Sequence, residues 1–235
     1  MITLKNVSDA IYLDDVKYVL ARDVSVTIPP GRYALLLGEP TLGRYAIDLL
    51  AGSRPPMKGQ VVCHGLRSWP IGRGGVLYGK LLGGHIVGLI ARLYGLDRTL
   101  CEVILKGLLT QPDQLDGIVS DWTGLMRREF LYALALLPKF NVHLVEGTLP
   151  SQPNRFASLW APLFGERTLG QTVIMSGIGP PSEFMKYCDM ALVFDGGQVF
   201  IEPDLENALT RYTFAQQSSE STNRESLDDE EEEVL

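Results

Sequence analysis

A continuous apolar run, YALLL at residues 33–37, constrains the fold more than any other feature of the sequence. A Pro-Pro-Gly turn precedes the run, and a stretch bounded by Gly38 and Gly43 follows it. A short apolar run between turn signals is typical of a strand that is buried on both faces of a parallel sheet. The helical pattern at 44–50 completes a strand, a glycine-bounded loop and a helix, which is the building unit of α/β domains.

Further strands and helices follow in an order that suits an α/β domain. The 235 residues suffice for one such domain with a substantial core, or for two small domains. The expected strands lie at 2–7, 24–28, 142–145, 172–176, 190–194 and 198–201, the last two forming a hairpin around Asp195-Gly196-Gly197. The expected helical stretches lie at 84–137, 154–164 and 203–214.

The formal net charge of −7 comes from the C-terminal end of the chain. From Glu220 onward there are eight acidic residues and one basic residue, so the other 20 acidic and 20 basic residues cancel. A neutral body lacks the basic surface that nucleic-acid binding requires, so nucleic acid is not an expected partner. Residues 216–235 contain too few apolar side chains to order themselves, and we expect either a solvated disordered tail or a docking or regulatory segment.

The cysteines and histidines give no sign of a metal site. Cys63, Cys101 and Cys188 are widely spaced and the three histidines occur singly, so we expect neither zinc nor a disulfide framework, and a reducing compartment. The two most apolar stretches are 81–96, which His85, Arg92 and four glycines interrupt, and 130–137, which is far shorter than the roughly 20 residues of a membrane span. Any membrane association is therefore expected to come through a partner.

The loop after the first buried strand lies where a phosphate-binding loop would lie. An intact loop of that type, G-x-x-x-x-G-K-[ST], surrounds phosphates with backbone N–H groups and a helix N-terminus, and its hydroxyl residue ligates magnesium. In this sequence the glycine spacing is kept, whereas arginine replaces the lysine and tyrosine replaces the hydroxyl residue. By itself the pattern is equally compatible with a plain structural turn. The candidate phosphate-binding residues are Gly38, Glu39, Pro40, Thr41, Leu42, Gly43, Arg44 and Tyr45.

Taken as a whole, the chain resembles the ATP-binding subunits of ABC transporters, and most closely those that export capsular polysaccharide. The resemblance covers residues 1–205 and is carried by the opening MITLKNVS, the loop, SWPIG at 68–72 with ARLYG at 91–95, and GLMR at 124–127. It implies a P-loop NTPase-like α/β core with a parallel sheet, an antiparallel β subdomain and a helical subdomain. The implied boundaries are 1–215 for the nucleotide-binding domain, 80–137 for its helical subdomain and 216–235 for the acidic tail.

The same resemblance implies where a nucleotide would bind. Tyr12 is the candidate for stacking on adenine, although a core tyrosine is an equally good interpretation. Tyr78 falls where the family has a glutamine that contacts the metal. In the loop, Thr41 replaces a usual glycine and resists a positive φ, and Pro40 lacks a backbone donor. Arg44 keeps the positive charge, but its planar fork is not equivalent to an ammonium group.

Several positions that the family uses for hydrolysis carry other side chains. Tyr45 brings a phenol where a small hydroxyl ligates magnesium, and Leu125 replaces the glycine of the signature segment. Glu146 retains one carboxylate at the metal position, whereas Gly147 replaces the catalytic glutamate and Gly177 the histidine that senses the γ-phosphate. Because phosphoryl transfer depends on positioning and electrostatic stabilisation, we expect no catalytic residue, no metal site and impaired or absent hydrolysis. ATP is the candidate ligand, and the changed donors argue against Mg²⁺.

The charge pattern adds a hypothesis about the changed site. Arg44 and Glu146 fall side by side in the implied fold, so we expect them to form an ion pair that fills the vacant phosphate and metal site. Removing one partner of a buried pair costs roughly 3–5 kcal/mol.

Three functions follow from these observations. The first is an ABC subunit deficient in hydrolysis, peripheral on the cytoplasmic face of the cell membrane, where it contacts an integral membrane permease and pairs with a second copy or with an intact ATPase. The second is an active ATPase with an atypical site, and the third is a scaffold protein of polysaccharide assembly. The helical stretch at 84–109 resembles the family's permease-contacting part, but its apolar residues fit a core equally well.

Overall fold

The computed structural model describes residues 1–73, 79–150, 154–177 and 179–211. Tyr78 and the acidic tail expected at 216–235 lie outside the described residues. Among the described helices, none combines the length and the apolar character that crossing a bilayer requires.

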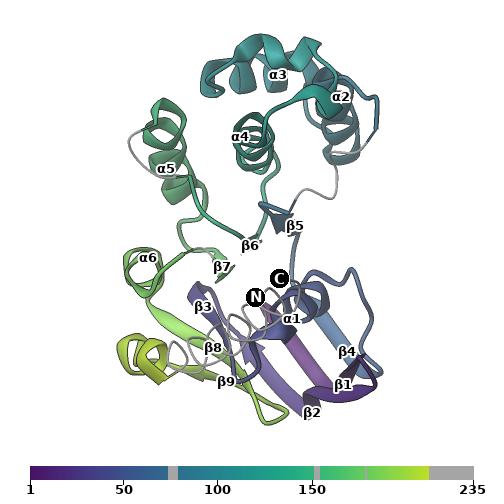
Figure 1. The fold of residues 1–235 in the computed structure, drawn as a ribbon, viewed down its shortest axis with the longest axis vertical. Coiled ribbons are helices and arrows are strands. Elements are labelled where there is room, and N and C mark those ends of the chain that lie inside the picture. The colour runs from purple at the N-terminus through teal and green to yellow at the C-terminus, as the bar shows by residue number, and fades with distance from the viewer. Residues whose placement is uncertain (74–78, 151–153, 178, 212–235) are drawn as a thin grey trace, which may run out of the picture.

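Three strands form a small antiparallel sheet in the order β2-β1-β4, seen beside α1 in Figure 1. They are β1 (Ile2–Leu13), β2 (Val16–Ile28) and β4 (Lys58–Cys63). The expected strands at 2–7 and 24–28 are parts of β1 and β2, which join through a tight hairpin. Asp14 and Asp15 have positive φ angles of 48° and 63° there, a conformation that aspartate tolerates better than most residues.

Six strands form the main sheet in the order β5-β6-β7-β3-β8-β9. Neighbouring strands from β5 to β8 run parallel, and β9 pairs antiparallel with β8 at the edge. This arrangement confirms the expected α/β fold with a parallel sheet and an antiparallel subdomain. The strands are β3 (Gly31–Leu37), β5 (Arg67–Ile71), β6 (Val142–Glu146), β7 (Thr172–Ser176), β8 (Met190–Asp195) and β9 (Gln198–Glu202).

The helices lie in different parts of the fold. In Figure 1, α2, α3 and α4 lie together, away from the antiparallel sheet, and α1 lies beside that sheet. Side chains cap several of the described helices; Asp97, for example, accepts a hydrogen bond from Leu100 N–H and Asn154 accepts one from Phe156 N–H. The helices are α1 (Gly43–Ala51), α2 (Gly83–Tyr94), α3 (Arg98–Leu108), α4 (Gly124–Leu134), α5 (Arg155–Arg167) and α6 (Pro181–Tyr187), and residues 205–211 are also helical.

The central strand β3 is buried on both faces, as the apolar run predicted. Ala34 and Leu36 face a core shared with α2 to α6, whereas Tyr33, Leu35 and Leu37 face a second core shared with α1 and the antiparallel sheet. The two-residue period of a strand explains this alternation. Its burial between two layers fixes where β3 ends, and that end carries the glycine-bounded loop.

A buried histidine makes the fold sensitive to acid. His143 lies in the middle of β6, is 1% exposed, and packs edge-on against Phe140 and Phe164 at ring-centroid distances of 5.8 and 5.9 Å. Burial, which disfavours the charged imidazolium, lowers the pKa of His143 to about 4 from the ordinary value of 6.5. Between these two values the unfolded chain binds a proton that the folded chain does not, so stability falls as the pH falls.

We expect the free energy of unfolding to drop by about 2 kcal/mol between pH 7 and pH 5 through this group alone. Urea denaturation at both pH values measures the drop. The matched variant His143→Leu lacks the titrating ring and should lose correspondingly less stability over the same interval. An equal loss in both proteins would show that His143 is not responsible.

Candidate functional site

The main sheet brings most of the candidate residues to one edge. The carboxyl ends of parallel strands meet at the same edge of a sheet, which is where ligands bind in open α/β folds. Glu146 and Ser176 are paired at the ends of β6 and β7, and Gly147 N–H donates to the Ser176 carbonyl at 3.0 Å. A Cβ at Gly43 would lie 3.8 Å from Ser176 Oγ, so the glycine-bounded loop lies directly against β7.

The loop itself folds as a helical turn. Pro40–Leu42 form a 3₁₀ turn that continues into α1, and Leu42 N–H donates to the Glu39 carbonyl at 3.1 Å. Within the described backbone, no residue from Gly38 to Gly43 has a positive φ. Phosphate-binding nests alternate right- and left-handed residues so that successive N–H groups converge on an anion. The loop therefore keeps the position of a phosphate-binding loop but has a different backbone conformation.

A carboxylate of the loop already uses one of the donors that an anion would need. Glu39 Oε1 accepts hydrogen bonds from the Thr41 N–H at 3.2 Å and from the Thr41 hydroxyl at 2.9 Å. Backbone N–H groups at the start of a helix are the usual partners of bound phosphate. Phosphate bound at this N–H would have to displace the Glu39 side chain.

The two changed residues at the start of α1 lie in different surroundings. Arg44 is exposed, whereas Tyr45 is partly buried and packs against the core below the sheet. The phenol ring of Tyr45 therefore belongs to the packing of the domain. That the ring occupies the place of a magnesium ligand, and that residues of the loop bind a nucleotide, stay predictions.

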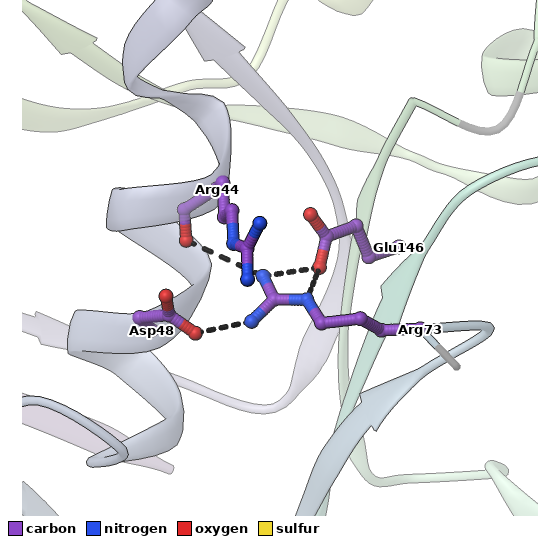
Figure 2. A network of polar contacts seen from close by, with 4 residues as sticks. All are labelled: Arg44, Asp48, Arg73 and Glu146. Atoms are coloured by element: carbon purple, nitrogen blue, oxygen red, sulfur yellow. Dashed lines mark hydrogen bonds and ion pairs between the residues drawn. The ribbon is translucent and has the colours of Figure 1, made fainter. Parts of the chain in front are cut away.

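The predicted ion pair between Arg44 and Glu146 is wrong, because a different arginine pairs with Glu146. Arg73 Nε donates to Glu146 Oε2 at 2.6 Å, and the terminal nitrogens of Arg73 form further ion pairs with Glu146 and Asp48 (Figure 2). Arg44 contributes its main-chain carbonyl oxygen, which lies 3.5 Å from Arg73 Nη2. Among the ion pairs of the described residues, none includes the Arg44 guanidinium.

Tertiary structure explains why Arg73 takes this place. Arg73 follows β5, which pairs with β6 through Ile71 and Val145, so the chain leaves β5 beside the end of β6. Gly72 turns the chain with a φ of 97°, and a Cβ there would collide with the carbonyl oxygen of Glu146. Neither β5 nor the role of Arg73 was predicted from the sequence. One sequence feature could have indicated such a contact. Asp48 is a lone carboxylate within the apolar sequence of α1, and a partly buried carboxylate needs a positively charged partner.

The donors at this edge do not fit a magnesium ion as they stand. The Glu146 carboxylate is engaged by a guanidinium, and Tyr45 replaces the small hydroxyl that would complete the coordination. Across the described residues, no group of three or more histidine, cysteine, aspartate or glutamate side chains could hold a metal ion. Magnesium is usually held by one or two carboxylates together with water and phosphate oxygens, so it would compete with Arg73 for the Glu146 carboxylate.

Gly147 and Gly177, which are neighbours in space, occupy positions where the resemblance places catalytic side chains. Gly147 and Gly177 have positive φ angles of 101° and 62°. A Cβ at Gly177 would lie 3.8 Å from Gly147 N, and a Cβ at Gly147 would have nothing within 4 Å. Neither position carries a side chain that could accept or donate a proton.

The other candidate residues are spread over the molecule. Tyr12 is 63% exposed on β1, so its interpretation as a core residue is wrong, and its ring lies 6.0 Å from Lys17 Nζ. Leu125 is exposed in the first turn of α4, which Thr123 caps by accepting a hydrogen bond from Met126 N–H at 3.3 Å. In Figure 1, α4 lies among the other helices of the helical part, apart from α1. The start of α4, with Leu125, therefore lies away from the glycine-bounded loop of the same chain.

Solved structures with the same fold are ATP-binding domains of ABC transporters. The fold matches an ATP-binding subunit of an ABC transporter with a TM-score of 0.71 at 17% identity, over 91% of this chain and 99% of the other. It also matches a dimeric ATP-binding cassette in a post-hydrolysis state bound to ADP and Pi, with a TM-score of 0.66 at 14% identity, over 86% and 98% of the two chains. The chain thus has the fold of an ABC nucleotide-binding domain.

The sequence is similar to several ATP-binding proteins, some of them named for polysialic acid transport or capsule polysaccharide export. It is 24% identical to the polysialic acid transport ATP-binding protein KpsT of Escherichia coli, over 85% of this chain and 90% of that protein. It is 24% identical to the ATP-binding protein BexA of Haemophilus influenzae (92% and 100%) and to the capsule polysaccharide export ATP-binding protein CtrD of Neisseria meningitidis (90% and 98%). No protein-family model matches the chain.

The contacts of Arg73 predict its contribution to stability. Replacing Arg73 with glutamine removes charge-assisted hydrogen bonds and leaves two carboxylates facing each other, so the free energy of unfolding should fall by about 1–3 kcal/mol. Arg44→Gln is the matched control, because Arg44 offers the network only its main-chain oxygen and should change stability by less than about 0.5 kcal/mol. Urea denaturation measures both, and equal effects of the two variants would contradict the network.

Proposed function

We propose that this chain is a nucleotide-binding-domain-like subunit of an ABC transporter that exports capsular polysaccharide, and that it is deficient in ATP hydrolysis. Its similarity to KpsT, BexA and CtrD over most of its length supports the transport role. The fold shared with ATP-binding subunits supports the position of the nucleotide, at the carboxyl edge of the main sheet. In this function the subunit acts structurally or as a regulatory partner.

One observation supports the deficiency in hydrolysis above all others. At the end of β6, the Glu146 carboxylate is held by Arg73, and Gly147 offers no side chain to activate a water molecule. Gly177, beside Gly147, offers no imidazole. Phosphoryl transfer relies on such positioned groups, and each tenfold loss raises the barrier by about 1.4 kcal/mol. Losing a base, a sensor and a free metal ligand together leaves little catalysis.

The proposed partners follow from the proposed function. The nucleotide-binding domain spans 1–215 with its helical subdomain at 80–137, and that subdomain contacts an integral membrane permease. The chain pairs with a second copy or with an intact ATPase subunit, and it is peripheral on the cytoplasmic face of the cell membrane. ATP is the proposed ligand, with Tyr12 stacking on its base. Co-purification with the permease would separate this function from a scaffold of polysaccharide assembly.

Purified protein tests the proposed deficiency directly. We expect phosphate release from Mg·ATP at the level of the protein-free blank, and no change in that level for the matched variant Arg44→Ala. An ATPase rate above the blank that Arg44→Ala abolishes would instead establish an active enzyme with an atypical site. Both proteins are compared at the same concentration, with and without the permease in detergent, because the partner can complete the site.

Nucleotide binding is a separate measurement. If ATP binds the folded chain, its stability should increase by about 1.4 kcal/mol for each tenfold rise in ATP above the dissociation constant. Thermal unfolding over a series of ATP concentrations measures the increase, with Tyr12→Ala as the variant expected to weaken it. A flat response would exclude ATP as the ligand and leave a structural subunit.

A further inference from the structure

The Arg73 guanidinium lies among oxygen atoms from three residues of two elements, α1 and β6. Asp48 on α1 and Glu146 at the end of β6 supply carboxylate oxygens, and Arg44 supplies a main-chain carbonyl oxygen (Figure 2). The side chains are largely shielded from solvent, with exposures of 23% for Arg73, 17% for Asp48 and 22% for Glu146. The Arg73 guanidinium thus sits at the centre of an oxygen-lined position.

Carboxylate and carbonyl oxygens are also the ligands that hard divalent cations take in proteins. Without a cation between them, Asp48 and Glu146 would repel each other in a partly buried place. An arginine neutralises this repulsion at every physiological pH, because its guanidinium does not lose its proton there. Its planar fork also contacts two carboxylates at once, which an ammonium group does less well.

We propose that Arg73 is a built-in substitute for a divalent cation. Its guanidinium holds Asp48 and Glu146 together and keeps metal ions out of the position between them. Where the proposed function also holds, a nucleotide at the neighbouring loop is bound without magnesium. The exclusion of metal itself depends only on the contacts of Arg73.

The backbone holds Arg73 in place independently of any ligand. The turn at Gly72 brings the main chain close to the Glu146 carbonyl, as the collision expected for a Cβ at Gly72 shows. The pairing of Ile71 with Val145 continues up to this turn. Arg73 therefore extends from a fixed backbone position directly beside one of its partners.

Removing Arg73 should convert this position into a metal site. In Arg73→Gln, the two carboxylates and the Arg44 carbonyl remain, and a divalent cation can neutralise them. We expect this variant of the full-length chain to bind one more Mn²⁺ than the wild type, counted from the loss of the free Mn²⁺ signal in electron paramagnetic resonance. The double variant Arg73→Gln/Asp48→Asn should lose the additional ion.

The acidic C-terminal residues bind Mn²⁺ weakly on their own, so the difference between variants is the quantity that counts. All three proteins carry the same eight acidic residues from Glu220 onward, and their contribution cancels. Arg73→Lys keeps a positive charge in the position and should bind no additional Mn²⁺. Circular dichroism in the presence of a chelator shows whether each variant is folded.

Each outcome decides the proposal. An additional Mn²⁺ in Arg73→Gln that the double variant lacks supports it. Wild-type binding of Mn²⁺ that Asp48→Asn abolishes overturns it, and so does a folded Arg73→Gln that binds no additional ion. If Arg73→Gln unfolds in chelator, refolding on addition of Mn²⁺ supports the proposal, and failure to refold overturns it.

The experiment is also independent of the proposed function. It uses Mn²⁺ alone, without nucleotide. Measurable ATPase activity would therefore refute the deficiency in hydrolysis and leave the expected number of bound Mn²⁺ ions unchanged. Conversely, the wild-type protein could lack ATPase activity and still bind Mn²⁺ between Asp48 and Glu146. That result would refute the proposed exclusion of metal by Arg73 and leave the proposed deficiency in hydrolysis standing.

Discussion

The burial of β3 on both faces is the constraint on which the rest of the structure depends. Leu35 and Leu37 belong to the core shared with α1 and the antiparallel sheet, and Ala34 and Leu36 belong to the core shared with the helices. A strand packed between two layers has only its ends free for function. The glycine-bounded loop at the end of β3, the end of β6 and the end of β7 consequently share one edge of the sheet.

At that edge the fold and the side-chain contacts can be considered separately. The strand order, the loop position and the helix after the loop are those of ABC nucleotide-binding domains. The side chains form an internally satisfied arrangement, in which Glu39 binds its own loop and Arg73 joins Asp48 to Glu146. Polar groups that are already paired must be separated before they can bind something else, and that separation opposes both phosphate and metal binding.

Much of the fold could be predicted because local patterns agree with the global structure. The apolar runs at 33–37, 142–145 and 172–176 are buried strands, and the hairpin around Asp195-Gly196-Gly197 joins β8 to β9. Other elements escaped prediction. The strand β5 contains Arg67, Ser68 and a proline, so it carries neither clear alternation nor a continuous apolar run. The part of the β1–β2 hairpin next to the turn mixes buried, half-buried and exposed residues without a regular alternation, and its turn is formed by two aspartates.

The candidate site was predictable in position but not in its contacts. The sequence by itself determined the α/β class, the loop after the buried strand and the presence of glycines at positions 147 and 177, since these follow from local patterns and residue identity. Only the tertiary structure decided that Arg73, and not Arg44, pairs with Glu146. The physical reason is that strand pairing between β5 and β6 places Arg73 next to a residue 73 positions away in the chain. Contacts of that range depend on how strands are ordered in the sheet, which no local pattern specifies.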